Sequence, residues 1–147
     1  MIGETPIEKQ LRLAILIDDA GAWFDVHSVQ IKNLILELIR QKQLWEKGID
    51  KFNEIIGLYS PVTESINPEK VAGTHYTLKD SGQFYRSMLV HVLSDSIVIE
   101  ADEHDMKDQR WWNEQNILGL TEQNMNIYVE NLRAKYISYT RFILGIN

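Results

Sequence analysis

The clearest hydrophobic pattern in the chain lies in its last quarter, where apolar and aromatic residues recur at helical spacing. The residues of this stripe are Met125, Tyr128, Val129, Leu132, Tyr136, Tyr139 and Ile143. Such spacing places the side chains on one face and is typical of a helix packed on a core. Thr121 stands where an N-cap is expected, and Glu122 follows in the first turn, where a helix dipole favours negative charge. The pattern predicts a long C-terminal helix.

A second helical stripe lies nearer the N-terminus, with the spacing i, i+3, i+4 and i+7. Its residues are Ile31, Leu34, Ile35 and Leu38. This spacing predicts a buried helix. We expect Ser28 to cap that helix, and we expect the helix to run to about Trp45, with Gly48 as its stop.

The first residues of the chain carry the signals of an earlier helix. Thr5 can act as the cap, Pro6 suits the first helical position, and Glu8 completes a capping box. We expect this helix to end near Gly21, because glycine is common at the C-terminal ends of helices. We interpret residues 1–25 as an N-terminal helical arm.

The middle of the chain changes from a helical pattern to one that favours strands and turns. Residues 53–60 place apolar side chains around Gly57 and predict a short strand. Pro61 then interrupts the pattern, and residues 61–77 are mostly polar, so we expect a long loop there.

The segment after this loop predicts a β-hairpin. Residues 87–93 and 97–99 are apolar and rich in strand-forming residues, and residues 94–95 can form the tight turn between them. Alternation along the second strand gives it one inward face. A short helix over residues 107–116, ended by Gly119, is expected next. The order of elements predicts, for residues 26–147, a single α+β domain: a small antiparallel sheet with a β-hairpin packed against two or three helices, and a long C-terminal helix.

A turn just before the hairpin carries the most specific local pattern. Asp80 and Ser81 can bond backbone amides, Gly82 permits a positive φ, and Phe84 can anchor the entry to the hairpin. Ser81 lies outside a Gly-x-Ser-x-Gly nucleophile elbow. We therefore interpret these four residues as a structural turn, and not as a catalytic one.

Composition and charge narrow the functional classes. The 147 residues fit one domain and carry a net charge of −6, with 15 Lys and Arg that are scattered along the chain. We therefore expect no specific nucleic-acid binding, because phosphates would meet mostly negative potential. The chain has no cysteine, no secretion signal and no apolar run that approaches the ~18 residues needed to span a bilayer, so we expect no membrane partner.

Candidate chemistry is sparse. The acidic stretch of residues 100–108 does not match an EF-hand loop, and a solvated loop is the favoured interpretation over a metal site. None of the four histidines lies four residues from another, and no Walker or dinucleotide motif occurs. We expect no catalytic residue, no metal and no cofactor, and hence a protein that is not an enzyme.

Aromatic and exposed apolar residues are the remaining candidates. Trp111 and Trp112 follow the acidic stretch, and neighbours in a helix point about 100° apart, so both cannot enter one core face equally. For the tyrosines of the last helix, core packing is favoured over a ligand groove. The candidate interface residues are Ile7, Leu11, Tyr59, Pro61, Trp111 and Trp112.

Three ordered segments resemble small structural proteins of tailed bacteriophages, of the tail-completion and head-to-tail connector kind. Residues 78–87 resemble the Asp-Thr/Ser-Gly turn that precedes a hairpin in those proteins, with Ser81 where threonine is usual. Two further pieces are similar to one phage-encoded group: residues 48–50 followed by 56–60, and residues 117–124 before the closing helix. The resemblance covers the chain from about Leu44 to its end.

The resemblance implies a function without catalytic residues. It implies a homo-oligomeric ring subunit at the phage neck or tail, in contact with portal, adaptor or tail-tube proteins. Its expected location is the virion, after synthesis in the host bacterial cytoplasm. Two alternatives stay open: a small phage-encoded binding module or regulator that grips a host protein through the tryptophan region, and an enzyme that uses the acidic stretch with His104.

Overall fold

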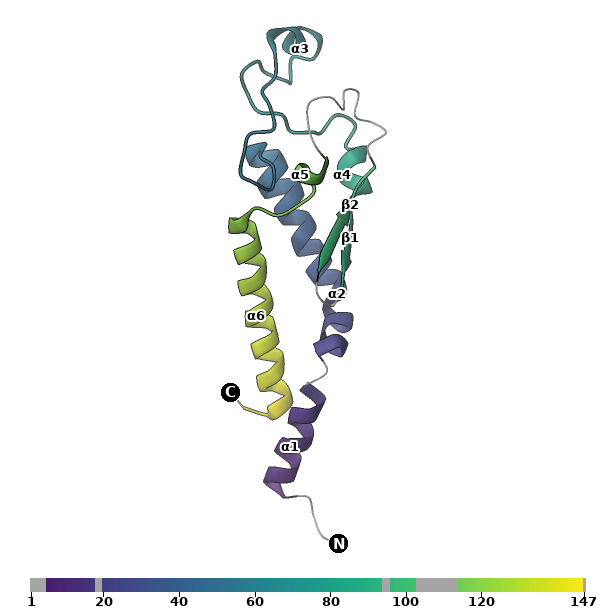
Figure 1. Cartoon of the computed structure of the whole chain (residues 1–147), viewed down its shortest axis with the longest axis vertical. Helices are drawn as coiled ribbons and strands as arrows, with labels where there is room; N and C mark the ends of the chain where they lie inside the picture. Colours follow the sequence, from purple (N-terminus) through teal and green to yellow (C-terminus); the bar gives the residue numbers. More distant parts are fainter. Residues whose placement is uncertain (1–4, 18–19, 94–95, 103–113, 147) are drawn as a thin grey trace.

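The computed structural model describes residues 5–17, 20–93, 96–102 and 114–146 of the chain. The molecule is elongated (Figure 1) and belongs to the α+β class, as predicted. A two-stranded antiparallel sheet is accompanied by several helices, of which the C-terminal one is long. The elements are α1 (Pro6–Ile17), α2 (Ala20–Glu37), η1 (Leu38–Trp45), α3 (Pro61–Ile66), α4 (Gln83–Ser87), β1 (Leu89–Val92), β2 (Ile97–Glu100), α5 (Glu114–Ile117) and α6 (Glu122–Leu144).

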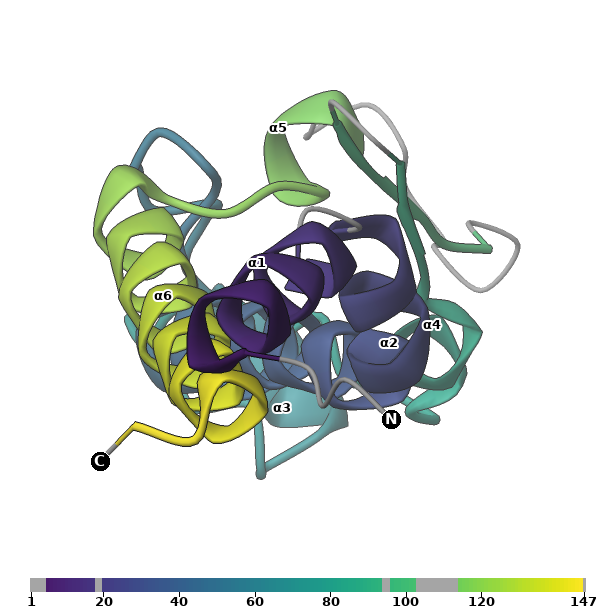
Figure 2. The same ribbon diagram turned by 90° about the horizontal axis from the view of Figure 1, so that it is seen from below.

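The helix α2 and its continuation η1 form the central column of the molecule. The helix α6 runs antiparallel to this column on one side, and the hairpin β1–β2 lies on the other (Figures 1 and 2). At one end of the molecule α1 packs against α6, where Gln10 Nε2 donates to the carbonyl oxygen of Leu144 at 3.0 Å. At the opposite end, the chain between η1 and α4 projects away from the column and carries α3 (Figure 1).

The core fills the space between the column, α6 and the hairpin. Apolar side chains from all three parts, together with α4 and α5, form one cluster. Burying this set is the main stabilising contribution that the structure shows. The buried members are Trp23, Ile31, Ile35, Leu38, Ile39, Leu44, Phe84, Met88, Val90, Ile117 and Tyr128.

The C-terminal helix begins where the sequence predicts. Thr121 is its N-cap, and the Thr121 Oγ1 accepts a hydrogen bond from the backbone N–H of Asn124 at 3.2 Å. Gly145, at φ +66°, ends the helix in the left-handed conformation. Tyr128 is buried, whereas Met125 and Val129 at the edge of the predicted stripe are exposed. The stripe is therefore narrower than the sequence pattern suggests.

The β-hairpin is confirmed for the described residues. Leu89 pairs with Glu100 and Val92 with Ile97 in an antiparallel register. The side chains of Ile97 and Ile99 pack on the core, while Val98 between them is exposed, as the alternation predicts. The turn predicted at residues 94–95 lies outside the described residues.

The first helix starts as predicted but ends earlier. The backbone N–H of Glu8 donates to Thr5 Oγ1 at 3.2 Å, and the Thr5 N–H donates back to Glu8 Oε2 at 2.8 Å. This capping box lowers the pKa of Glu8, first through the backbone hydrogen bond from Thr5. The helix α1 ends at Ile17, and Gly21 lies in the first turn of α2 rather than at the end of α1.

The predicted start of the second helix is wrong. Ser28 lies inside α2, which begins at Ala20, eight residues earlier. The physical reason is packing: Trp23 is 2% exposed and meets the ring of Tyr136 on α6 edge to face at 5.3 Å. Tertiary burial of this kind stabilises helical turns that local signals do not mark. The division of the chain after residue 25 stays a prediction, and α2 passes that point without a break.

The column ends as predicted, through an irregular segment. The residues of η1 form a π-helix, and after a last turn at residues 46–47 the chain leaves the helix at Gly48 with φ +60°. A positive φ is accessible to glycine at little cost. The stop predicted at Gly48 is confirmed.

Three further predictions for the middle of the chain are wrong. Residues 53–60 form no strand and contribute only the isolated bridges Ile49–Ile55 and Leu58–His75. The expected loop 61–77 contains α3, because Ser60 caps it and Pro61 occupies its first turn. The turn at Gly82 leads first into α4, and only then into the hairpin.

Other predictions lie partly or wholly outside the described residues. Within the helix expected over residues 107–116, the structure describes only the start of α5, which runs to Ile117. Residues 103–108 of the acidic stretch are not described. In the described part of the chain, no helix combines the length and the apolar character that crossing a bilayer requires.

Candidate functional site

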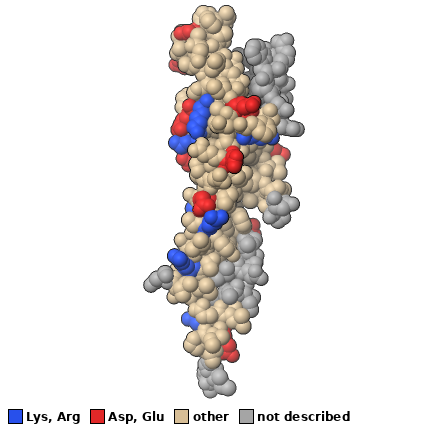
Figure 3. Space-filling model, turned by 60° about the vertical axis from the view of Figure 1, so that its left-hand side comes forward, with Lys and Arg blue, Asp and Glu red and all other residues tan. Residues whose placement is uncertain are grey.

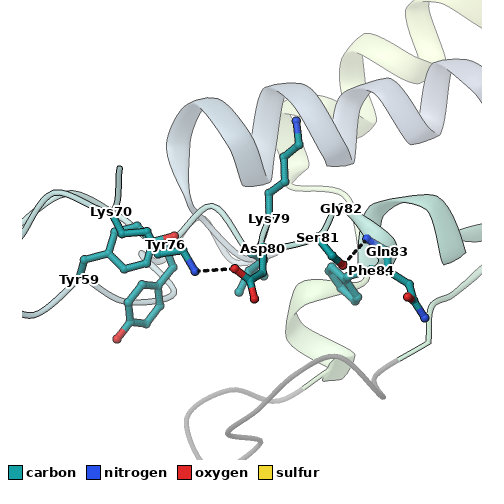
Figure 4. Close-up of a pocket in the computed structure, with 10 residues that line it drawn as sticks. Tyr59, Lys70, Tyr76, Lys79, Asp80, Ser81, Gly82, Gln83 and Phe84 are labelled. Carbon is teal, nitrogen blue, oxygen red and sulfur yellow. Dashed lines mark hydrogen bonds and ion pairs between the residues drawn. The ribbon is translucent and has the colours of Figure 1, made fainter. Parts of the chain in front are cut away.

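The predicted structural turn lines a small pocket in the projecting half of the molecule. The pocket has a volume of about 150 Å³ and opens between the turn and a pair of tyrosines (Figure 4). Four of its residues are the ones that the sequence singled out as the turn, and Tyr59 was singled out as a candidate interface residue. The lining residues are Tyr59, Lys70, Tyr76, Leu78, Lys79, Asp80, Ser81, Gly82, Gln83 and Phe84.

The backbone of the turn has the geometry that its sequence predicts. Gly82 has φ +80°, a left-handed conformation that disfavours residues with a Cβ atom. Ser81 Oγ accepts a hydrogen bond from the backbone N–H of Gln83 at 3.2 Å, and the Gly82 carbonyl accepts one from the N–H of Arg86 at 3.1 Å. Phe84 is buried in the core. The turn thus fastens the start of α4 to the core.

Asp80 plays a different part from the one expected. Its carboxylate forms an ion pair with Lys70 Nζ at 3.1 Å, in place of the expected bond to a backbone amide within the described chain. The Asp80 side chain is 61% exposed, so the pair contributes little to stability. The pair does connect the turn to the segment that follows α3, and it brings Lys70 over the ring of Tyr59 at 5.9 Å from the centroid.

Two tyrosines form the opposite wall of the pocket. The rings of Tyr59 and Tyr76 meet edge to face with centroids 4.9 Å apart. The Tyr59 hydroxyl lies 3.2 Å from Thr77 Oγ1 and accepts a hydrogen bond from the Thr77 N–H. The Tyr76 ring packs so closely on Gly57 that a Cβ atom there would overlap it. The wall is therefore held in place by direct contacts.

Leu78, just before the turn, has an unfavourable backbone conformation. Leu78 has φ +52°, which costs a residue with a side chain about 1–2 kcal/mol. The hydroxyl of Tyr85 donates to the carbonyl of Thr77, next to this position. Burial raises the pKa of Tyr85 well above its usual range, and the charge of Tyr59 adds to the effect. The surrounding contacts thus fix Leu78 in an unfavourable conformation.

The lining of the pocket is mainly apolar and aromatic, and it includes Lys70 and Lys79. The Lys79 ammonium lies 4.6 Å from the centroid of the Trp45 ring, a cation–π contact. Across the described residues, no group of three or more His, Asp or Glu side chains is placed to hold a metal ion.

The other candidate interface residues are spread over the molecule. Pro61 is exposed at the start of α3, close in sequence to Tyr59 of the pocket. Ile7 and Leu11 are exposed on α1, at the opposite end of the molecule (Figure 1). Trp111 and Trp112 lie outside the described residues. The structure therefore brings the turn and Tyr59 together and separates them from α1.

Sequence reasoning missed five residues of the pocket. Lys70 and Tyr76 lie in the segment 61–77 that was interpreted as a loop, and Leu78, Lys79 and Gln83 lie in the turn segment without having been singled out. The spacing of Tyr76 from the turn could have drawn attention to it, since aromatic residues next to a turn often pack on it. For the lysines, the sequence carries no local signal.

Geometry defines the chain as a small α+β protein with an apolar surface pocket beside a glycine turn. Comparisons with protein-family models, with curated proteins and with solved structures found no match to the chain. The functional argument therefore depends on the pocket and on the exposed surfaces of the molecule.

Proposed function

We propose that the chain is a non-enzymatic virion protein of a tailed bacteriophage, a ring subunit at the neck or tail that joins head to tail or completes the tail. The observation that carries this proposal is the presence of exposed apolar side chains at both ends of an elongated molecule. Ring subunits need two different contact surfaces, one for each neighbour.

The first of these surfaces lies at the end of the molecule that holds α1 and the end of α6 (Figure 1). Ile7 is 81% exposed and Phe142 is 83% exposed. Exposed apolar side chains that gather in one region are typical of protein interfaces. The exposed apolar residues of this region are Ile7, Leu11, Val26, Val29, Phe142 and Ile146.

The second surface lies on the projecting half of the molecule. The helix α3 exposes the side chains of Val62 and Ile66, and the latter is 80% exposed. The pocket lined by the turn opens in the same half. A projecting, apolar-tipped segment can reach a neighbouring subunit without disturbing the core.

The turn and the charge of the chain support the phage assignment. Residues 78–87 resemble the turn of tail-completion and connector proteins, and the left-handed Gly82 gives that resemblance the backbone geometry that such a turn requires. A net charge of −6 suits a protein beside a DNA conduit, because it does not retain phosphates. The partners proposed are further copies of the chain and portal, adaptor or tail-tube proteins.

The proposal is tested on the purified protein and on virions. Native mass spectrometry and electron microscopy of the protein are expected to show a closed ring. Mass spectrometry of purified virions is expected to detect the chain. A strictly monomeric protein that is absent from virions contradicts the proposal. A pull-down that retrieves one stoichiometric host protein, and no virion protein, favours a host-binding module instead.

A further inference from the structure

We infer that the ring contact is head to tail, with α3 of one copy seated in the groove between α2 and α6 of a second copy. This inference depends on the proposed ring function and names the two surfaces that meet. It follows from the shapes, the exposed apolar side chains and the charges of two regions at opposite ends of the molecule (Figure 1).

The helix α3 forms an acidic, apolar tip. Val62 and Ile66 stand four residues apart, on one face of the helix, and both are exposed. Residues 61–69 contain Glu64 and Glu69 and no Lys or Arg. One oxygen of Glu64 accepts a hydrogen bond from the N–H of Ala72 at 3.1 Å, which holds that carboxylate in place. The tip therefore combines two aliphatic side chains with two negative charges.

The groove between α2 and α6 has the complementary properties. Its volume is about 470 Å³, and the residues that line it include His27, Gln30, Lys135, Ser138, Tyr139 and Phe142. The exposed ring of Phe142 and the neighbouring Tyr139 supply an apolar wall for aliphatic side chains.

The C-terminal half of α6 beside the groove is basic. Residues 131–147 contain Arg133, Lys135 and Arg141 and no Asp or Glu. Arg133 is paired with Glu130 at 2.7 Å, whereas Lys135 and Arg141 form no ion pair with the residues that the structure describes, and they are the cations that would meet an acidic partner. Figure 3 shows Asp and Glu at the upper tip, and acidic and basic side chains mixed over the rest of this face of the molecule.

Charge favours a contact between the two unlike surfaces. A contact of tip with tip, or of groove with groove, would place like charges together, which is unfavourable. A contact of the tip with the groove pairs opposite charges, and it can repeat head to tail or form twice around a two-fold axis. Only the head-to-tail repeat generates a ring, so the proposed ring function selects that arrangement.

Disulfide crosslinking tests the contact directly, because the natural chain has no cysteine to interfere. Two variants are made in the full chain, Val62→Cys on the tip and Ser138→Cys in the groove. Both positions are exposed, so neither change removes core packing. Oxidation of the two variants mixed at equal concentration is expected to give a disulfide-linked dimer that contains one copy of each. A chain that carries both changes is expected to give a ladder of linked multimers.

The matched control replaces Asn126, an exposed residue nearer the start of α6, with cysteine. Position 126 lies twelve residues from Ser138, about 18 Å along the helix, so it cannot occupy the same contact. The Val62→Cys and Ser138→Cys mixture is expected to crosslink about tenfold or more faster than the Val62→Cys and Asn126→Cys mixture, a gain within the range that proximity provides. Equal rates overturn the inference.

Three further outcomes are informative. If either cysteine variant alone crosslinks as fast as the mixture, like surfaces meet, and if the chain with both changes gives only closed dimers, the tip and the groove meet around a two-fold axis; either result shows that the head-to-tail inference is wrong. If wild-type rings are seen by electron microscopy but the mixture does not crosslink above the control, other surfaces build the ring, and the proposed function stands without this inference. A wild-type chain that stays monomeric at every concentration refutes the inference that a second copy occupies the groove. Mass spectrometry of virions then tests the phage assignment by itself.

Discussion

Replacing Gln43 with leucine is expected to destabilise the protein by a large fraction of its folding free energy. Gln43 lies in η1 with a fully buried side chain. Its Nε2 donates to the carbonyl oxygen of Gly119 at 2.8 Å, and its Oε1 accepts from the N–H of Thr121 at 3.1 Å and from Asn124 Nδ2 at 3.3 Å. These contacts join the end of the central column to the start of α6.

The magnitude follows from the groups that the substitution leaves without partners. Leucine cannot replace any of the three hydrogen bonds, and a buried polar group left unsatisfied costs about 1–3 kcal/mol. Asn124 Nδ2 keeps a contact of 3.4 Å with the carbonyl oxygen of Leu38, and leucine gains some apolar burial, so the full sum is not reached. We expect a loss of about 2–4 kcal/mol. For a domain of this size that corresponds to a fall in Tm of about 4–16 °C.

The assay is urea unfolding followed by circular dichroism, with Gln41→Leu as the matched control. Gln41 lies in the same π-helix, but it is exposed and its contact is with Glu46, so its replacement should change the stability by less than about 0.5 kcal/mol. A double-mutant cycle with Asn124→Leu should show a coupling of about 0.5–3 kcal/mol. A Gln43→Leu variant that loses less than about 1 kcal/mol, within the range of an ordinary neutral hydrogen bond, refutes the role of this network.

Two further predictions concern the turn and its neighbour. Gly82→Val should lower the free energy of unfolding by about 1–3 kcal/mol, because it forces a β-branched residue to adopt φ +80°. Ser81→Thr keeps the hydroxyl and should be tolerated. Urea unfolding of both variants checks this, and a Gly82→Val protein as stable as wild type contradicts the turn assignment. Burial raises the pKa of Tyr85 and of Tyr128, so the unfolded state loses these protons first as the pH rises. The free energy of unfolding should therefore fall above about pH 10. In Tyr85→Phe this alkaline fall should be smaller, and an unchanged fall contradicts the claim that burial raises the pKa of Tyr85.

Local signals predicted the parts of the fold in which neighbouring residues act on one another. The capping box of Thr5 and Glu8 and the cap at Thr121 involve residues three apart, and both formed as expected. The helix stop at Gly48 and the positive φ at Gly82 were also predicted, because glycine adopts a positive φ at little cost. In each of these cases the free energy that decides the structure comes from within one turn of the chain.

The failures share the opposite property. The helix α2 extends to Ala20 because Trp23 packs on Tyr136, more than a hundred residues away in the sequence. The buried side chain of Gln43, in the π-helix η1, likewise finds its hydrogen-bond partners at Gly119, Thr121 and Asn124, far away in the sequence. Nothing in the spacing of apolar residues over 38–45 marks this irregularity. Periodicity describes one segment at a time, and these features depend on two.

The helix α3 was missed for a different reason. Pro61 was treated as the end of a pattern, although proline after a serine is also a favourable start, and Ser60 Oγ accepts the N–H of Thr63 at 3.2 Å. The same kind of signal was used correctly at Thr5 and Pro6. The difference is Glu8, which completes the capping box of α1, while α3 has a threonine at the equivalent position.

The exposure of α3 explains why the sequence could not point to the tip as a contact surface. Val62 and Ile66 have the spacing of a buried stripe, and only the projection of their helix from the central column leaves them in solvent. Periodicity shows that side chains share a face, but it does not show whether that face is covered. Ile7 and Leu11 were identified as interface candidates on the predicted N-terminal arm. The tip is instead an internal segment, and the contact proposed for it rests on its shape together with its charge.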